Sequence, residues 1–235
     1  IGEATPCELT GDKQMPDQQR TTLDSANFIW NVADDVLRGN FKQHEYGDVI
    51  LPFVVLRRLD CVLEEHKDEV IAAKKKFKGK LDDDKLHPVL LKATDGLNFY
   101  NTSDYDLKRL TQDAKSLLLN FNHYISGYSP NVRELLENFH LEATVGKLAK
   151  NDLLFLLIDK FTEVDLHPKN VSNHEVSLIF EELLRRFSEM SNETAGEHYT
   201  PREVIRLMVN LMFAEQKDEL KGKGLIRSLY DPAAG

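Results

Sequence analysis

Two short segments near the end of the chain have residue types and a spacing that suit the binding of a charged small molecule. The first runs from Gly196 to Glu203 and reads Gly-Glu-His-Tyr-Thr-Pro-Arg-Glu. Thr200 is a favoured N-cap, Pro201 suits the first helical position, and Glu203 completes a capping box, so the pattern predicts a helix start. The unpaired N–H groups and the positive dipole end of such a start attract an anion such as a carboxylate.

The second segment follows the helix that is predicted to begin at Thr200. Apolar residues recur there at helical spacing and predict one buried stripe, which consists of Val204, Leu207, Met208, Leu211 and Met212. Residues 225–230 then predict a short strand, which ends in the turn Asp-Pro-Ala-Ala-Gly at 231–235. A strand that runs into a small-residue turn is typical of a doubly wound sheet, which binds its ligand at the carboxyl edge.

In this order the two segments resemble the cofactor site of adenine-N6 DNA methyltransferases. They look most like the modification (M) subunit of type I restriction-modification enzymes. Residues 50–60, Ile-Leu-Pro-Phe-Val-Val-Leu-Arg-Arg-Leu-Asp, resemble the signature helix of that subunit's N-terminal helical domain. The resemblance implies S-adenosyl-methionine as the cofactor and site-specific methylation of adenine in DNA. It also implies three partners, which are a specificity subunit, a restriction subunit and double-stranded DNA.

The resemblance further implies which residues hold the cofactor. The helix start at Thr200 would receive the methionine carboxylate between His198 and Tyr199, and Asp231 would face the ammonium group. Gly235 has no side chain, so the backbone can approach the ligand closely there. Ala234 stands where many relatives carry Cys, and both residues are small. The full implied set is Glu197, His198, Tyr199, Thr200, Pro201, Asp231, Pro232, Ala233, Ala234 and Gly235.

No catalytic residue is expected within the chain. The family uses an Asn-Pro-Pro-Tyr-type motif that stacks the flipped adenine and accepts hydrogen bonds from its amino group, and the sequence lacks this motif. His198 is therefore not assigned as a catalytic base. Since the chain holds only part of the cofactor site, we expect it to be inactive by itself. Two alternatives stay open: a stand-alone adenine methyltransferase, and a non-enzymatic helical interaction module.

The composition limits the other function classes. The 235 residues carry a net charge of −9, which argues against a chain that grips nucleic acid tightly alone, because clustered cations drive phosphate binding. Cys7 and Cys61 are too few and too separated for a disulfide scaffold or a zinc site, and the histidines lack metal-ligand spacing. No apolar run reaches membrane-spanning length and the start is not of the secretory kind, which favours a cytoplasmic protein.

The expected fold is mainly α. Residues 1–22 predict a flexible lead-in, 23–167 a helical N-terminal domain, and 168–235 the start of an S-adenosyl-methionine-dependent methyltransferase domain. This last part would hold only the first helices and strand of a Rossmann-like α/β fold. The boundary is placed at residues 166–170, Leu-His-Pro-Lys-Asn, a polar stretch that should be exposed and open to proteases.

Within this plan the apolar periodicity predicts individual helices. One starts at Leu23 and stops at Gly39, and a second covers residues 46–63, with Pro52 as a kink or as its true start. A third starts at Ser103, with Asp106 in capping-box register, and packs residues to Leu118 inward. Further helices are expected at 131–139, at 152–164 and after a cap formed by Ser172 and Glu175.

Two basic groups allow more than one interpretation. Arg57 and Arg58 form either a solvated helix edge with a nearby ion pair or a contact with DNA or another subunit. Residues 74–80 hold the densest lysine run of the chain, Lys74, Lys75, Lys76, Lys78 and Lys80. Such a run is usually a solvated helix end, here offset by the acids at 82–84, and the alternative is contact with nucleic acid.

Overall fold

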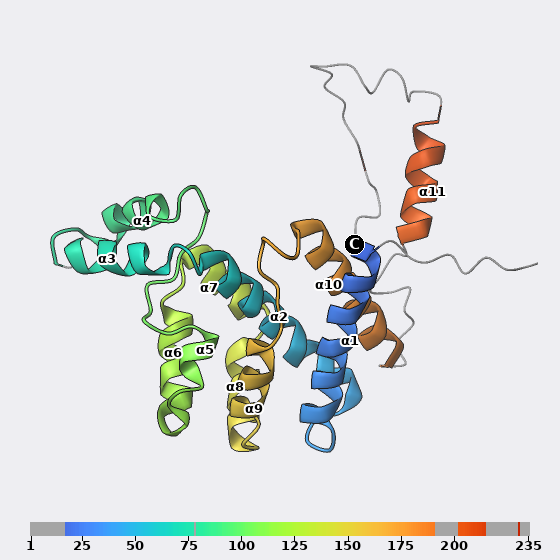
Figure 1. Ribbon diagram of the computed structural model, residues 1–235, viewed down its shortest axis with the longest axis horizontal. Helices are drawn as coiled ribbons and strands as arrows, with labels where there is room; N and C mark the ends of the chain where they lie inside the picture. The colour runs from blue at the N-terminus through green and yellow to red at the C-terminus, as the bar shows by residue number, and fades with distance from the viewer. Residues whose placement is uncertain (1–16, 78, 191–201, 215–229, 231–235) are drawn as a thin grey trace, which may run out of the picture.

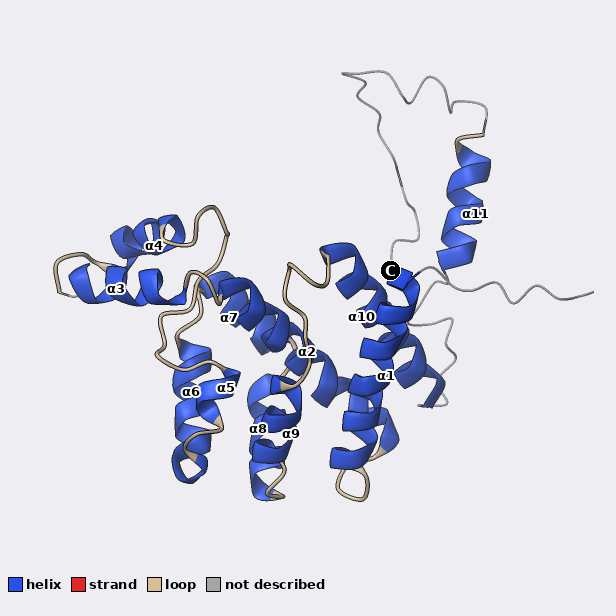
Figure 2. Cartoon of the chain, viewed as in Figure 1, coloured by secondary structure: helices blue, strands red, loops and turns tan. Residues whose placement is uncertain are grey.

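The computed structural model describes residues 17–77, 79–190, 202–214 and 230, which form an array of helices (Figure 1). Figure 2 shows no strand in the described part, and the β pairing there consists of isolated bridges at Arg38–Phe41 and Asn101–Tyr128. The predicted mainly α fold class is confirmed. The helices are α1 (Asp17–Leu37), η1 (Gln43–Glu45), α2 (Tyr46–Leu63), α3 (Lys67–Phe77), α4 (Asp83–Lys92), α5 (Leu107–Leu110), η2 (Ala114–Ser116), α6 (Leu117–Ser126), α7 (Pro130–Asn138), α8 (Leu141–Lys150), α9 (Leu154–Thr162), α10 (Asn173–Met190) and α11 (Arg202–Met212).

Helix α2 lies at the centre of the packing and contacts α1, α8, α9 and α10. Its residue Phe53 is fully buried, and the Phe53 ring centroid lies 6.0 Å from that of Phe121 and 5.6 Å from that of Phe161. These two partners come from α6 and α9, so one side chain joins three helices that are distant in sequence. Burial of such an aromatic side chain is worth about 3–5 kcal/mol, as judged by its loss on truncation to Ala.

Helix α10 closes the array by packing against α1 and the start of α2. Its Phe187 stacks on Trp30 with ring centroids 5.3 Å apart, and its Arg186 donates a hydrogen bond of 2.7 Å to Asn27. The predicted cap of this helix is confirmed. The Glu175 carboxylate accepts from the Ser172 N–H at 2.7 Å, and the Ser172 hydroxyl accepts from the Glu175 N–H at 3.3 Å.

Several predicted boundaries are corrected. Helix α1 begins at Asp17 rather than at Leu23, although it ends before Gly39, which has a φ of 85° that favours glycine. Helix α2 begins at Tyr46, so Pro52 lies inside it and does not mark its start.

The single helix predicted from Ser103 to Leu118 is wrong. The structure has α5, η2 and α6 in its place, because two acids start new helices. The Asp106 carboxylate accepts from the Arg109 N–H at 2.7 Å, and the Asp113 carboxylate accepts from the Ser116 N–H at 3.3 Å. Leu118 is 43% exposed instead of packed inward.

The two arginines of α2 hold the segment that leads into α10. Arg57 donates through Nε to the Val164 carbonyl at 2.7 Å. Arg58 donates to the carbonyls of Leu166 and Val171, the latter at 2.9 Å, and to the Asn173 side chain. The solvated-edge interpretation of this pair is therefore wrong, since the guanidinium groups bind backbone carbonyls more than a hundred positions away. Leu166 is fully buried, whereas residues 168–170 at the tip of the segment are exposed.

A half-buried residue with a carboxylate side chain, Asp60, joins α2 to α5 and α6. Asp60 accepts hydrogen bonds from the Leu107 N–H at 2.8 Å and from the Tyr124 hydroxyl at 2.7 Å, and Tyr128 bonds the Tyr124 hydroxyl at 2.6 Å. Loss of hydration raises the pKa of Asp60 to about 6, although the hydrogen bonds from Leu107 and Tyr124 favour the charged form. Burial lowers the pKa of nearby Lys67, whose ammonium donates to the Tyr105 carbonyl.

We expect Arg58→Met to destabilise the fold by about 2–4 kcal/mol, because it retains most of the aliphatic stem and removes three hydrogen bonds from a charged donor. Arg57→Met removes a single such bond and should cost about 1–2 kcal/mol. Urea unfolding of both variants measures the difference. Equal losses of a few tenths of a kcal/mol would contradict a role of Arg58 in holding this segment.

We also expect Asp60→Asn to change how stability depends on pH. A carboxyl whose pKa is raised on folding stabilises the fold fully below its unfolded pKa, and this contribution is lost as the pH rises through the folded pKa of about 6. The rise from 3.8 to about 6 corresponds to about 3 kcal/mol. Since Asn resembles the protonated acid, the variant should match the wild type near pH 4 and become the more stable protein at pH 7.

Urea unfolding at a series of pH values tests this expectation. The control is Asp68→Asn, which removes an exposed acid of α3. A difference in stability between Asp60→Asn and the wild type that stays constant from pH 4 to pH 7 would rule out titration of Asp60 in this range.

Candidate cofactor and interaction sites

The residues predicted to hold the cofactor lie outside the described part of the chain. This applies to Glu197, His198, Tyr199, Thr200 and Pro201, and to Asp231, Pro232, Ala233, Ala234 and Gly235. The predicted strand at 225–230 also lies outside it, apart from Tyr230, which is 86% exposed. Whether the two segments meet therefore stays a prediction.

The helix predicted to follow the first segment is confirmed as α11, which begins at Arg202. The prediction that its apolar stripe is buried is wrong for the described residues. Exposure runs from 45% at Val204 to 69% at Leu211, and Ile205 and Val209 are exposed as well. Figure 1 draws α11 apart from α1 and α10. The apolar side chains of this helix lie on one side, opposite Arg206 and Asn210, and an apolar helix face is typical of a surface that packs against a protein core.

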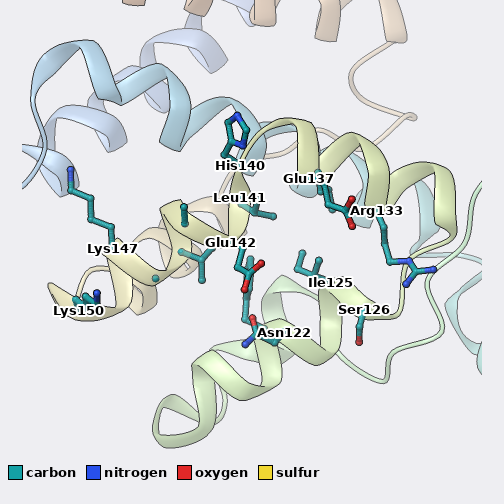
Figure 3. Close-up of a pocket in the computed structure, with 15 residues that line it drawn as sticks. Asn122, Ile125, Ser126, Arg133, Glu137, His140, Leu141, Glu142, Lys147 and Lys150 are labelled. Carbon is teal, nitrogen blue, oxygen red and sulfur yellow. The ribbon is translucent and has the colours of Figure 1, made fainter.

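A groove of about 900 Å³ lies between α6, α7 and α8 (Figure 3). Its floor is apolar and includes Ile125 and Val145, whereas Figure 3 shows charges of both signs around it, such as Arg133, Glu142 and Lys150. None of the residues that line the groove belongs to the set predicted to hold the cofactor. The groove is therefore separate from the predicted cofactor residues in sequence.

Asp60, Tyr124 and Tyr128 form a cluster of titratable side chains with raised pKa values, but its two hydroxyl groups are not accessible to a substrate. Tyr124 is fully buried and Tyr128 is 2% exposed, and burial raises the pKa of both hydroxyls. Its role is structural. This cluster was not predicted from the sequence. Asp60 falls at helical spacing from Phe53 and Leu56, and a carboxylate on an apolar helix face is the pattern that indicates such a cluster.

The lysine run belongs to a helical hairpin that we call the lysine hairpin, residues 67–92, made of α3, α4 and the turn between them. A small separate core of Val70, Leu90 and Tyr100 holds it together. Figure 1 places it at the end of the array away from α1 and α10. Lys74 donates to the Thr102 hydroxyl at 3.1 Å, whereas Lys75 is exposed and lies 3.8 Å from an exposed Asp104 carboxylate.

No cluster of three or more His, Cys, Asp or Glu side chains with metal-binding geometry occurs among the described residues. None of the described helices combines the length and apolar character that crossing a bilayer requires.

Comparison with known proteins gives two family matches, and the chain is also similar to proteins such as a type I restriction enzyme methylase subunit. The family model described as HsdM N-terminal domain matches residues 25–161, and the model described as N-6 DNA Methylase matches residues 171–235. The Type I restriction enzyme MjaIX methylase subunit of Methanocaldococcus jannaschii is 24% identical over 237 residues. That match covers 93% of this chain and 39% of the relative, so the chain spans well under half of the relative's length. No solved structure matches significantly.

The two matched ranges place α10 in the second part of the chain, whereas its packing places it with the helices of the first part. The predicted boundary at 166–170 falls between the matched ranges, yet α10, which lies in the second range, packs against α1 and α2. The division into domains therefore stays a prediction.

Most of the helical array lies within the first matched range, which spans more than half of the chain and includes residues 50–60. The chain therefore belongs to the HsdM N-terminal domain family and continues into a segment similar to N-6 DNA methylases.

Proposed function

We propose that the protein to which this chain belongs is the methylase subunit of a type I restriction enzyme. It transfers a methyl group from S-adenosyl-methionine to N6 of adenine in DNA. One observation carries the proposal: the HsdM N-terminal and N-6 DNA methylase matches follow each other in one chain, and 93% of that chain aligns with a protein named as a type I restriction enzyme methylase subunit. The chain alone is inactive in this proposal, because the base-binding motif of the resembled family is absent from its sequence.

The proposed cofactor site combines the residues 197–201 with the turn at 231–235. Helix α11 supports the first half of the site, since it begins directly after Pro201 and presents free N–H groups at its start. These N–H groups and Thr200 bind the methionine carboxylate, while Asp231 binds the ammonium group. Gly235 admits the ligand close to the backbone.

The exposed apolar surface of α11 supports a larger methyltransferase domain around this site. Seven apolar side chains of this helix are exposed, and they need a partner in a folded domain: Val204, Ile205, Leu207, Met208, Val209, Leu211 and Met212. The relative is more than twice as long as the matched region, so a protein of its length has the residues to cover this helix.

The proposed partners are a specificity subunit, a restriction subunit and double-stranded DNA, and the proposed location is the cytoplasm. The acidic balance of −9 fits this division, because a separate subunit would supply the sequence-specific contacts. A stand-alone methyltransferase is less well supported, since the word subunit in the relative's name points to an assembly.

The reaction is tested by comparing methylated bases in DNA from a host with and without the parent gene. N6-methyladenine at one defined sequence should disappear when the gene is deleted and return on complementation. Unchanged methylation patterns would contradict the proposal and favour a non-enzymatic helical module.

The cofactor assignment is tested on the full-length protein by calorimetry. Asp231→Asn removes the charge that faces the ammonium group and should weaken binding of S-adenosyl-methionine by about 1–3 kcal/mol, the scale of a charge-assisted hydrogen bond. Asp218→Asn removes an acid between the two motifs and serves as the matched control. Equal affinity in both variants would remove Asp231 from the site.

A further inference from the structure

We propose that the lysine hairpin is a DNA-binding arm that contacts the phosphate backbone of duplex DNA outside the recognition sequence. This inference rests on the proposed function, because it takes DNA as the substrate of the assembled enzyme. Its site consists of Lys75, Lys76 and Lys80, with Lys74 behind them. No residue predicted for cofactor binding takes part.

The charge distribution supports this surface. Residues 74–80 contain five lysines and no acid, although the chain as a whole has 39 acidic residues against 30 basic ones. Most of the surface therefore repels a polyanion, and the hairpin is where phosphates meet concentrated positive charge. Release of condensed counterions then drives binding. The acids at the start of α4 offset the lysines only in part, since Asp82 lies 4.0 Å from Lys85 on its own helix.

The lysines are exposed and weakly paired, so they can exchange their partners for phosphates. Lys75 has a side-chain exposure of 72%, and its pairing with Asp104, which is itself 68% exposed, is loose at 3.8 Å. Lys76 is exposed, and its ammonium lies 5.5 Å from the centroid of the Phe77 ring. Lys80 is exposed at the turn, and no ion pair joins it to another side chain in the described part of the chain.

The hairpin is held as a rigid arm. Its small core packs α3 on α4, and two inner lysines tie α3 to the loop before α5, Lys67 through the Tyr105 carbonyl and Lys74 through Thr102. A preorganised arm loses little conformational freedom when it binds. The inner lysines thus fix the arm, and the outer lysines are left to contact a ligand.

The arm lies far from the part that continues into the methyltransferase. Phe187 of α10 faces Gly47 at the start of α2, while α3 follows the other end of α2. The 18 residues of α2 span roughly 27 Å at 1.5 Å per residue, the length of about eight base pairs. The lysines therefore contact DNA that flanks the target, and phosphate contacts there carry no sequence information.

A basic last turn also suits the dipole of α3, and this alone would explain the lysines without any DNA contact. The two explanations differ in what a charge change does. If only the dipole matters, neutral residues loosen α3 and leave DNA affinity alone. If the arm binds phosphates, they reduce the salt dependence of DNA binding.

The experiment uses the assembled enzyme and compares Lys75→Gln/Lys76→Gln/Lys80→Gln with the control Lys108→Gln/Lys115→Gln/Lys150→Gln. The control removes the same charge from exposed lysines outside the hairpin. Affinity is measured as a function of salt concentration on two duplexes. One has about 15 flanking base pairs on each side, which extends past the roughly 27 Å length of α2, and the other is trimmed to the recognition sequence. Circular dichroism and gel filtration check folding and assembly.

On the long duplex the hairpin variant should bind about ten-fold more weakly at low salt, and the slope of log affinity against log salt should fall by up to about 3. The control should behave as the wild type, and the trimmed duplex should not distinguish the three proteins. Sequence preference and methylation at saturating DNA should be unchanged. An unaltered slope on the long duplex, or a loss of assembly in place of a change in slope, would overturn the inference. Absence of methyl transfer by the wild type would instead count against the proposed function.

Discussion

The burial of α2 is the constraint on which the rest of the structure depends. A helix that is apolar on several sides must be covered by several neighbours, and α2 is covered by α1, α8, α9 and α10, which come from both ends of the array in sequence. The aromatic contacts of Phe53 fix the middle of this arrangement. Because α2 is one continuous helix, its packing also sets the distance between the junction with α10 at its start and the lysine hairpin at its end.

Polar groups on α2 decide which loops meet this core. Asp60 costs free energy at neutral pH because it is charged away from water, yet it satisfies the Leu107 N–H at the start of α5 and the Tyr124 hydroxyl. Arg58 donates hydrogen bonds to the carbonyls of Leu166 and Val171, which would otherwise lack these partners. An apolar replacement would leave these groups buried without partners. The polar contacts therefore select one arrangement of the segments that the apolar contacts alone would only bring together.

Local signals predicted much of the fold, and long-range contacts explain most of the failures. The periodicity of α1 and α2, the stop before Gly39 and the Ser172 cap depend on neighbours within one or two turns, and all are present in the structure. The role of Arg57 could not be read from the sequence, because Val164 lies 107 positions away. Between Ser103 and Leu118 the apolar pattern predicted one helix, but the Asp113 carboxylate accepts a hydrogen bond from the Ser116 N–H and starts a new helix there. The cofactor residues remain predictions, supported by motif order and family match.

The arrangement separates two tasks along α2. The segment matched by the N-6 DNA methylase family leaves from the α10 end, so in the proposed function the contact with the target base is made there or beyond. A duplex bound in this way would meet the helical array only at other positions, and the net negative charge of the chain leaves few places for a phosphate. Backbone contacts at such places can hold and orient a duplex without reading it. In the proposed enzyme, recognition of sequence is therefore assigned to residues outside the helical array.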